Sequence, residues 1–247
     1  MVVIVIFLVS LIPSVFYYFY LRNLKKDNEE YKKNCRNTLF RGLLAGFPVF
    51  LLDLVLYLGL SALGLKDILS PAWMELIKCL VINAFVEELV KVSIGYKTIK
   101  KNHDNVTWLD MITYITISSV GFEILESAFY IPSMNAGQML IRGLSMMHVS
   151  FGLIEGWYAG KYAKTGKNIY RVLTMAVTII IHGLYNFGLR QEAPELMGAF
   201  SLLAAAGCLV YWIYMIFYIR RKKEDPDFTT PLYASAAEEE AAEDPEA

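Results

Sequence analysis

The sequence predicts an all-α protein, a polytopic bundle of about seven transmembrane helices with its N-terminus outside the cell and its C-terminus in the cytoplasm. Three observations predict this class. Hydrophobic residue types make up 56% of the 247 residues and the mean hydropathy is +0.42, too apolar for a soluble domain of this size. Apolar runs long enough to cross a bilayer recur along the chain, and the segments between them alternate in positive charge.

Each predicted span is an apolar run of roughly 20 residues, which a helix needs to cross about 30 Å of hydrocarbon. The first run has no basic residue before it, so it is predicted to be a span and not a cleaved signal peptide. The runs are about 2–21, 42–65, 72–96, 107–131, 138–160, 172–190 and 196–219.

The charge of the intervening segments sets the predicted orientation. Segments 22–41, 97–106, 161–171 and 220–223 together carry 18 Lys and Arg residues, whereas the alternate segments carry only Lys66 and Arg190. The positive-inside rule places the basic segments in the cytoplasm of a multi-pass protein of the cell membrane. The lipid bilayer is therefore one expected partner. Nucleic acid is not, because apolar runs separate the basic groups.

The composition divides the chain into two parts. Residues 1–220 form the predicted transmembrane domain, and 221–247 form a tail in which nine acidic and no basic residues follow position 223. Because such a segment buries little apolar surface, we expect a disordered, acidic cytoplasmic tail. The three cysteines are odd in number and have no C-x-x-C spacing, which excludes a disulfide framework and a thiolate zinc cluster.

Four of the predicted spans contain ionisable residues, which cost about 2.5–3.5 kcal/mol each at the bilayer centre and usually face the bundle interior or a water-filled cavity. Asn83, Glu87 and Lys91 recur at intervals of four and share one helix face, as do His182 and Asn186. The full set is Asn83, Glu87, Glu88 and Lys91, then Glu123 and Glu126, then Arg142, His148 and Glu155, then His182 and Asn186.

Each of these residues also has a purely structural interpretation. Glu87 and Lys91 could form a buried ion pair, and a single histidine in a span is more often a packing residue than a ligand. Four helices that all carry carboxylate or imidazole groups are, however, a costly way to hold a bundle together when small residues suffice. The set as a whole predicts a functional site near mid-membrane, although the depth of Glu123 fits this level better than that of Glu126.

These side chains can activate water. A glutamate can act as a general base, a histidine or asparagine can donate to an oxyanion, or three residues can hold a zinc ion that activates its bound water. Peptide hydrolysis is the natural reaction. The sequence contains no G-x-S-G, G-x-G-D or H-E-x-x-H motif, which excludes the other common designs of intramembrane protease.

The ordered motifs resemble the PrsW family of intramembrane proteases, which is related to the CAAX prenyl endopeptidases and the bacteriocin-processing enzymes. The resemblance covers about residues 72–190 and rests on Glu87-Glu88-x-x-Lys91, Phe122-x-x-x-Glu126, a single His148 and His182-x-x-x-Asn186. Glu126 separates the chain from the CAAX endopeptidases, which carry histidine there, so prenylated substrates are not expected. Ser127 departs from the asparagine expected after this glutamate in the PrsW family.

The resemblance implies a catalytic site of seven residues: Glu87, Glu88, Lys91, Glu126, His148, His182 and Asn186. One of the two adjacent glutamates activates the water, and the lysine orients the pair. Glu126 and His148 help to hold the water or a metal, and His182 with Asn186 stabilises the oxyanion. Glu126, His148 and His182 could complete a three-ligand zinc site, but the same residues could bind water directly. The implied partner is a single-span membrane substrate, such as an anti-sigma factor.

Two other classes of function stay open on the sequence alone. A cation or proton transporter could use the same intramembrane acids, and a non-catalytic immunity or scaffold protein would need none of them for chemistry. Among the other polar residues, Glu75 and Lys78 are predicted to form an interfacial pair. Asp53 is either a supporting group or part of a substrate path, and Glu155 is expected to meet headgroups or loop lysines.

Overall fold

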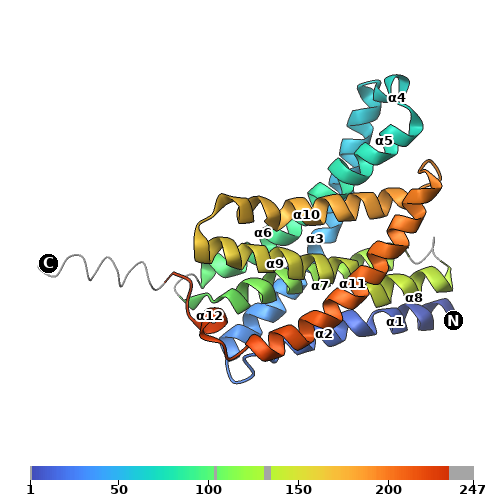
Figure 1. The fold of residues 1–247 in the computed structure, drawn as a ribbon. Helices are drawn as coiled ribbons and strands as arrows, with labels where there is room; N and C mark the ends of the chain where they lie inside the picture. The colour runs from blue at the N-terminus through green and yellow to red at the C-terminus, as the bar shows by residue number, and fades with distance from the viewer. Residues whose placement is uncertain (1, 103–104, 131–134, 234–247) are drawn as a thin grey trace, which may run out of the picture.

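The computed structural model describes residues 2–102, 105–130 and 135–233, which form a helical bundle (Figure 1). Its helices are α1 (Val2–Ser10), α2 (Ile12–Arg22), α3 (Glu29–Ala62), α4 (Leu65–Ile68), α5 (Pro71–Ile77), the π-helix η1 (Lys78–Ala84), α6 (Phe85–Lys101), α7 (Trp108–Tyr130), α8 (Ala136–Ser145), α9 (Met147–Thr165), α10 (Asn168–Gly188), α11 (Glu195–Lys222) and α12 (Pro226–Thr229). The predicted all-α class is confirmed.

Five of the described helical segments are long and apolar enough to cross a membrane: Ile4–Arg22, Glu29–Ala62, Trp108–Tyr130, Asn168–Gly188 and Glu195–Lys222. The two remaining predicted spans are helical but interrupted. The span at 72–96 consists of α5, η1 and α6, and the span at 138–160 is divided into α8 and α9 at Met146. Both interruptions lie next to predicted site residues.

The helix α7 forms the centre of the bundle, and 89% of its apolar stretch is buried. Close packing against its neighbours depends on small residues. A Cβ atom added at Gly121 of α7 would lie 2.2 Å from the carbonyl oxygen of Leu39 on α3, and one added at Gly42 of α3 would lie 2.2 Å from that of Ser118 on α7. Backbones in contact at such distances are typical of membrane helices packed through small residues.

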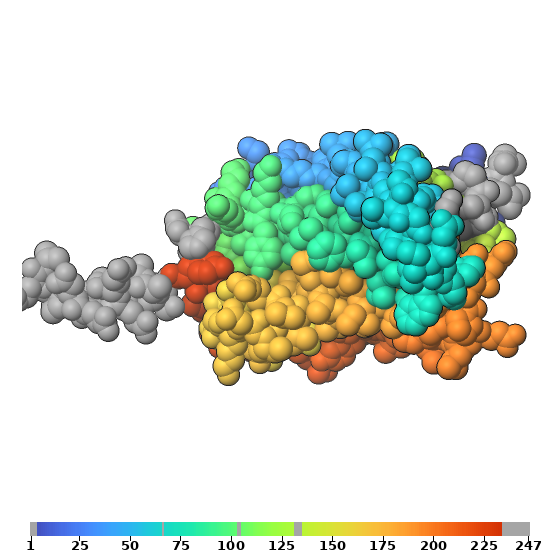
Figure 2. Space-filling model, turned by 90° about the horizontal axis from the view of Figure 1, so that it is seen from above, coloured from blue at the N-terminus to red at the C-terminus, as the bar shows by residue number. Residues whose placement is uncertain are grey.

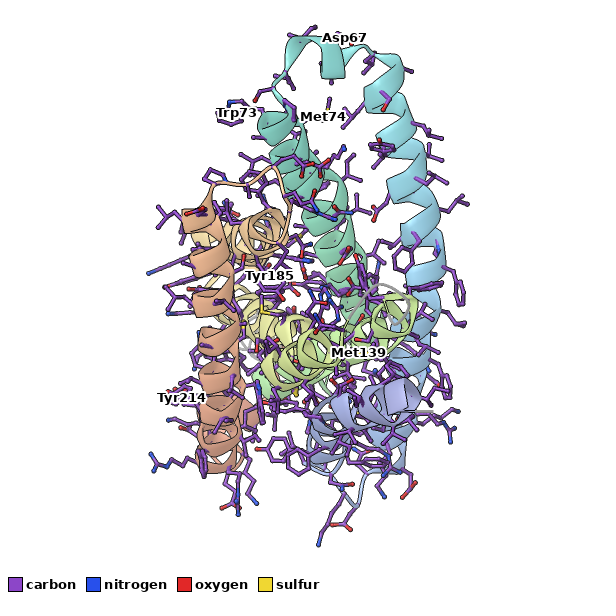
Figure 3. All side chains as sticks on the ribbon, turned by 90° about the vertical axis from the view of Figure 1, so that its right-hand side faces the viewer. Asp67, Trp73, Met74, Met139, Tyr185 and Tyr214 are labelled. Carbon is purple, nitrogen blue, oxygen red and sulfur yellow. The ribbon has the colours of Figure 1, made fainter. Side chains whose placement is uncertain are left out.

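The second half of α3 leaves the bundle together with α4 and α5 as a projecting hairpin. Asp67, Trp73 and Met74 mark this hairpin in Figure 3, away from the other helices. From above, α6 and the hairpin fill the surface between α3 and α10 (Figure 2). The helix α3 begins at Glu29, well before the predicted span at 42–65. At 1.5 Å per residue it is about 50 Å long, so its basic first turns extend beyond a bilayer.

The first residues of the predicted tail are ordered, which corrects the expectation of disorder for this part. Asp225 caps α12 by accepting from the backbone of Asp227. Phe228 is buried and stacks on Trp108, with ring centroids 4.7 Å apart, and Leu232 donates its backbone N–H to Val106. Composition did not predict this contact, because a single buried aromatic ring anchors the segment and hardly changes its average hydrophobicity. Residues 234–247 lie outside the described residues, so their predicted disorder stays a prediction.

Phe228→Ala should release this segment without unfolding the bundle. Truncation of a buried phenylalanine costs about 3–5 kcal/mol, more than a short docked segment can lose and stay bound. Limited proteolysis of detergent-solubilised protein should then cut within 224–233 far faster than in the wild type. Asp227→Asn is the control, because it removes only the exposed ion pair with Lys164, and exposed pairs contribute about 0–1 kcal/mol. Equal cleavage rates in the Phe228 variant and the wild type would contradict the prediction.

Candidate active site

Four helices bring six of the seven predicted site residues into one buried cluster. The six side chains come from α6, α7, α9 and α10, and each residue is at most 5% exposed: Glu87, Glu88, Lys91, Glu126, His148 and His182. Asn186 follows His182 by one turn of α10 and is half-buried. The structure therefore places the predicted set together, with the carboxamide at its edge.

The π-helical segment η1 ends at Ala84, directly before the two adjacent glutamates. A π-helix widens the turn and so rotates the residues that follow relative to a regular α-helix. Glu87 and Glu88 both point into the cluster and are both buried, although adjacent residues of an α-helix diverge by about 100°. Such π segments occur frequently at functional sites.

A second irregularity lies at the start of α9. Met146 has φ 44°, a left-handed conformation unusual for a residue other than glycine, and separates α8 from α9. The break leaves the first backbone N–H groups of α9 inside the bundle, and that of His148 donates to Glu123 Oε2 at 3.1 Å. Glu123 thus caps α9, while Glu126 reaches the imidazole of His148. Both acids of α7 therefore face the site.

A chain of charged contacts fixes the orientation of His182. Its Nδ1 lies 2.6 Å from Glu88 Oε1, and Glu88 Oε2 lies 2.7 Å from Lys91 Nζ. Lys91 therefore pairs with Glu88 and not, as the sequence suggested, with Glu87. When Nδ1–H of the neutral imidazole donates to this carboxylate, the Nε2 atom of His182 carries the lone pair. Its direction is held by the carboxylate behind it.

Glu87 lies opposite this lone pair. Its Oε2 atom is 3.8 Å from His182 Nε2, is buried and has no hydrogen-bond partner. If both atoms carry lone pairs, they repel unless a proton, a hydrogen-bond donor or a cation lies near both. The arrangement can therefore accept a water molecule or a metal ion beside the two atoms.

Both ring nitrogens of His148 are occupied. Lys91 Nζ lies 2.7 Å from its Nδ1, and its Nε2 contacts Glu126. An ammonium group only donates, so Nδ1 accepts, and Nε2–H donates to the Glu126 carboxylate. Lys91 therefore joins the Glu88–His182 pair to the His148–Glu126 pair.

Arg142 is a site residue that sequence reasoning noted in its span but did not place in the site. It lies 2.5 Å from Glu126 Oε2 and donates to Ser127 Oγ at 3.1 Å. Ser127 thus serves the same hydrogen-bond network in which an asparagine was expected. The position of Arg142 inside a span already indicated a buried anionic partner. The sequence alone could not show which of several acids this partner is.

Three further polar positions can now be assigned. Glu155 is fully buried, accepts from Thr178 at 2.9 Å and lies beside Glu88, so the expected contact with headgroups is wrong. Asp53 accepts from Asn83 at 3.2 Å, next to the cluster, which fits a supporting group. Glu75 and Lys78 form the predicted pair, at 2.5 Å.

The donor set for a metal differs from the predicted one. Glu87, His148 and His182 each offer a ligand atom, and these atoms lie within 4.8 Å of one another. Glu87 takes the place predicted for Glu126, which instead pairs with Arg142. The chemistry of two imidazoles and one carboxylate fits zinc, and the unpartnered oxygen of Glu87 fits a cation. His148 can join only if it gives up Lys91 or Glu126.

A cavity of about 370 Å³ reaches the site from the end of the bundle that carries the α10–α11 loop. Glu126 and Asn186 line it together with Arg142, Tyr185 and Arg190. Figure 3 views this end, where Tyr185 of α10 and Met139 of α8 are labelled. The cavity gives Glu126 and Asn186, at the edge of the cluster, a path to the outside.

A buried centre of glutamate and histidine residues, reached by a cavity within a bundle of membrane-crossing helices, defines an intramembrane hydrolase. The chain belongs to the PrsW family: the family described as PrsW family intramembrane metalloprotease matches residues 35–220, most of the chain. The resemblance based on the motifs is confirmed, and it extends beyond 72–190. Neither the curated proteins nor the solved structures gave a match. The protein is thus a protease with several helices apolar enough to cross a membrane.

Proposed function

We propose that this chain hydrolyses a peptide bond of a membrane-protein substrate with water activated between Glu87 and His182. The observation that carries the proposal is the buried pair Glu87 Oε2 and His182 Nε2, which lie 3.8 Å apart, where the Glu87 oxygen has no hydrogen-bond partner among the described residues. A water molecule at this place donates one hydrogen to the carboxylate, which is the geometry of a general base.

The neighbouring residues have supporting roles in this proposal. Glu88 fixes the tautomer and direction of His182, and Lys91 balances the charge of Glu88 while it holds His148. Asn186 lines the cavity beside Glu126. Its amide N–H₂ can donate to the oxyanion that forms when water attacks the scissile carbonyl.

A metal ion, if bound, would be held by Glu87, His182 and His148, and not by Glu126. Zinc in such a site lowers the pKa of bound water and polarises the substrate carbonyl. Without a metal, Glu87 is the general base of this proposal; with a metal bound, its carboxylate would be a ligand instead, and the metal would activate the water. Glu88 orients the His182 imidazole in both cases.

The proposed substrate is a single-span protein such as an anti-sigma factor, in the cell membrane. We further propose seven crossings, with the interrupted spans counted, and with the basic segments in the cytoplasm. This orientation places the α10–α11 loop and the cavity on the outer side of the membrane, since this loop follows α10 at the end opposite to Asn168 (Figure 1). Cleavage would then occur near the outer boundary of the substrate's span.

N-terminal proteomics of membranes tests the function. Cells that express the wild type should contain new N-termini within or beside transmembrane segments, and cells that express Glu87→Gln should lack them. Both proteins must be present in the membrane at equal amounts and be monodisperse in detergent. Equal sets of N-termini in the two samples, in cells that contain single-span test proteins, would refute the proposal.

A further inference from the structure

The cavity that leads to the site has a positively charged mouth. Besides Glu126 and Asn186 at its inner end, it is lined by Arg142, Arg190 and apolar residues such as Leu189. A polypeptide that reaches Glu126 from this end of the bundle must pass these groups. The charges of the lining residues therefore bear on the choice of substrate.

The two arginines differ in whether their charge is already balanced. Arg142 forms an ion pair with Glu126 at 2.5 Å, so it offers little net charge to a ligand. Arg190 is exposed, and within the described residues its side-chain partner is the uncharged thiol of Cys79. No described carboxylate lies within ion-pair distance of Arg190.

Two other acids of this end of the bundle lie at a different cavity. Glu75 pairs with Lys78 at 2.5 Å. Glu192, two residues after Arg190, lines a separate cavity of about 200 Å³ beside α5, together with Glu75 and Lys78. The guanidinium at the mouth of the larger cavity is thus available to an anionic group from outside the chain.

Arg190 also lies just past the C-terminus of α10, where a cation is favoured by the helix dipole. The helix dipole explains why a basic residue follows α10, but it does not explain why the side chain of Arg190 lines the cavity. A lysine or arginine anywhere around the helix end would serve the dipole equally, whereas a planar guanidinium beside a cavity matches a carboxylate with two parallel hydrogen bonds.

We propose that Arg190 is a specificity residue, which binds an aspartate or glutamate side chain of the substrate segment that occupies the cavity. The proposal rests on the proposed function and adds a sequence preference to it. Because Arg190 is fixed relative to Glu126 and Asn186, the acidic residue should occur at one set distance from the cleaved bond. A charge-assisted hydrogen bond of this kind should favour acidic over neutral substrates by about tenfold in kcat/KM, mainly through KM.

A library of single-span test proteins measures this preference. Each member carries the same leucine–alanine transmembrane segment, and the residues that flank it on the outer side are randomised. The library is reconstituted in liposomes with the wild type, with Arg190→Gln, with Arg190→Glu or with Glu87→Gln, and new N-termini are sequenced. The wild type should enrich Asp and Glu at one position, Arg190→Gln should lose this enrichment, and Arg190→Glu should enrich Lys and Arg there.

The matched control is Arg171→Gln, which removes an exposed arginine at the opposite end of α10 and should leave the acidic preference unchanged. Cleavage by the wild type without an acidic preference, or a preference that persists in Arg190→Gln, would overturn the proposed role of Arg190 and leave the protease function intact. A wild type that cleaves no more than Glu87→Gln would instead overturn the proposed function, and the role of Arg190 with it.

Discussion

Glu87→Gln should abolish proteolysis and leave the bundle folded. The substitution keeps the shape of the side chain but removes the carboxylate that faces His182 Nε2. An amide cannot accept a proton from water under these conditions, and loss of a general base typically slows a reaction by about 10²–10⁴-fold. Because Glu87 Oε2 has no hydrogen-bond partner, its replacement breaks no network within the described residues. Turnover of a single-span substrate in proteoliposomes measures the loss.

The adjacent residue provides a contrast that separates chemistry from folding. Glu88→Gln removes the ion pair with Lys91 and leaves this buried ammonium group without its 2.7 Å partner. Breaking a buried pair from one side costs about 3–5 kcal/mol. We therefore expect Glu88→Gln to lose both activity and thermal stability in detergent, and Glu87→Gln to lose activity alone.

Glu75, on the helix α5 that continues through η1 into α6, serves as the control. Glu75→Gln removes a partly exposed pair with Lys78, far from the cluster, and should retain turnover and stability. Retained turnover in Glu87→Gln would show that the base is another acid of the cluster, with Glu126 the next candidate because it contacts His148. Lost turnover together with a collapse of the fold would instead show that Glu87 has a structural role.

The sequence predicted which residues form the site better than it predicted the contacts between them. In-span acids and histidines are conspicuous because the bilayer penalises them, and this penalty made Glu87, His148 and His182 visible without a structure. Which acid pairs with which base depends on helix rotation at the level of single residues. The π segment before Glu87 and the break at Met146 change that rotation, and neither has a reliable sequence signal.

Residues with ambiguous roles were resolved by contacts between distant segments. Glu155 was expected at the headgroups because it lies late in its predicted span, but it is buried in the bundle, where Thr178 of α10 donates a hydrogen bond to it. Phe228 lies in a polar, acidic stretch that gave no sign of order, yet it stacks on Trp108, 120 positions earlier in the chain. Composition is a local average, so it does not register one long-range aromatic contact.

Arg142→Met should destabilise the protein strongly and inactivate it. Arg142 neutralises Glu126 at 2.5 Å inside the bundle, where the two side chains are 14% and 5% exposed. Without the guanidinium, the carboxylate is a buried charge with one neutral donor, His148. Removal of one partner of a buried pair costs about 3–5 kcal/mol, which corresponds to a fall of about 10 °C in the unfolding temperature of a chain of this size.

The double variant Arg142→Met, Glu126→Gln distinguishes a charge effect from a packing effect. Replacement of both partners leaves no buried charge, so most of the lost stability should return. Activity should not return, because a glutamine holds His148 less firmly than a carboxylate does. A double variant as unstable as Arg142→Met would instead assign the loss to packing of Arg142 against Tyr130, whose ring centroid lies 5.1 Å away. An Arg142→Met protein with the wild-type unfolding temperature would show that the pair with Glu126 is absent from the folded protein. The two variants thus test whether charge holds Arg142 of α8 to Glu126, and through Glu126 to His148. This connection keeps the geometry of the site, because His148 lies directly after the helix break at Met146.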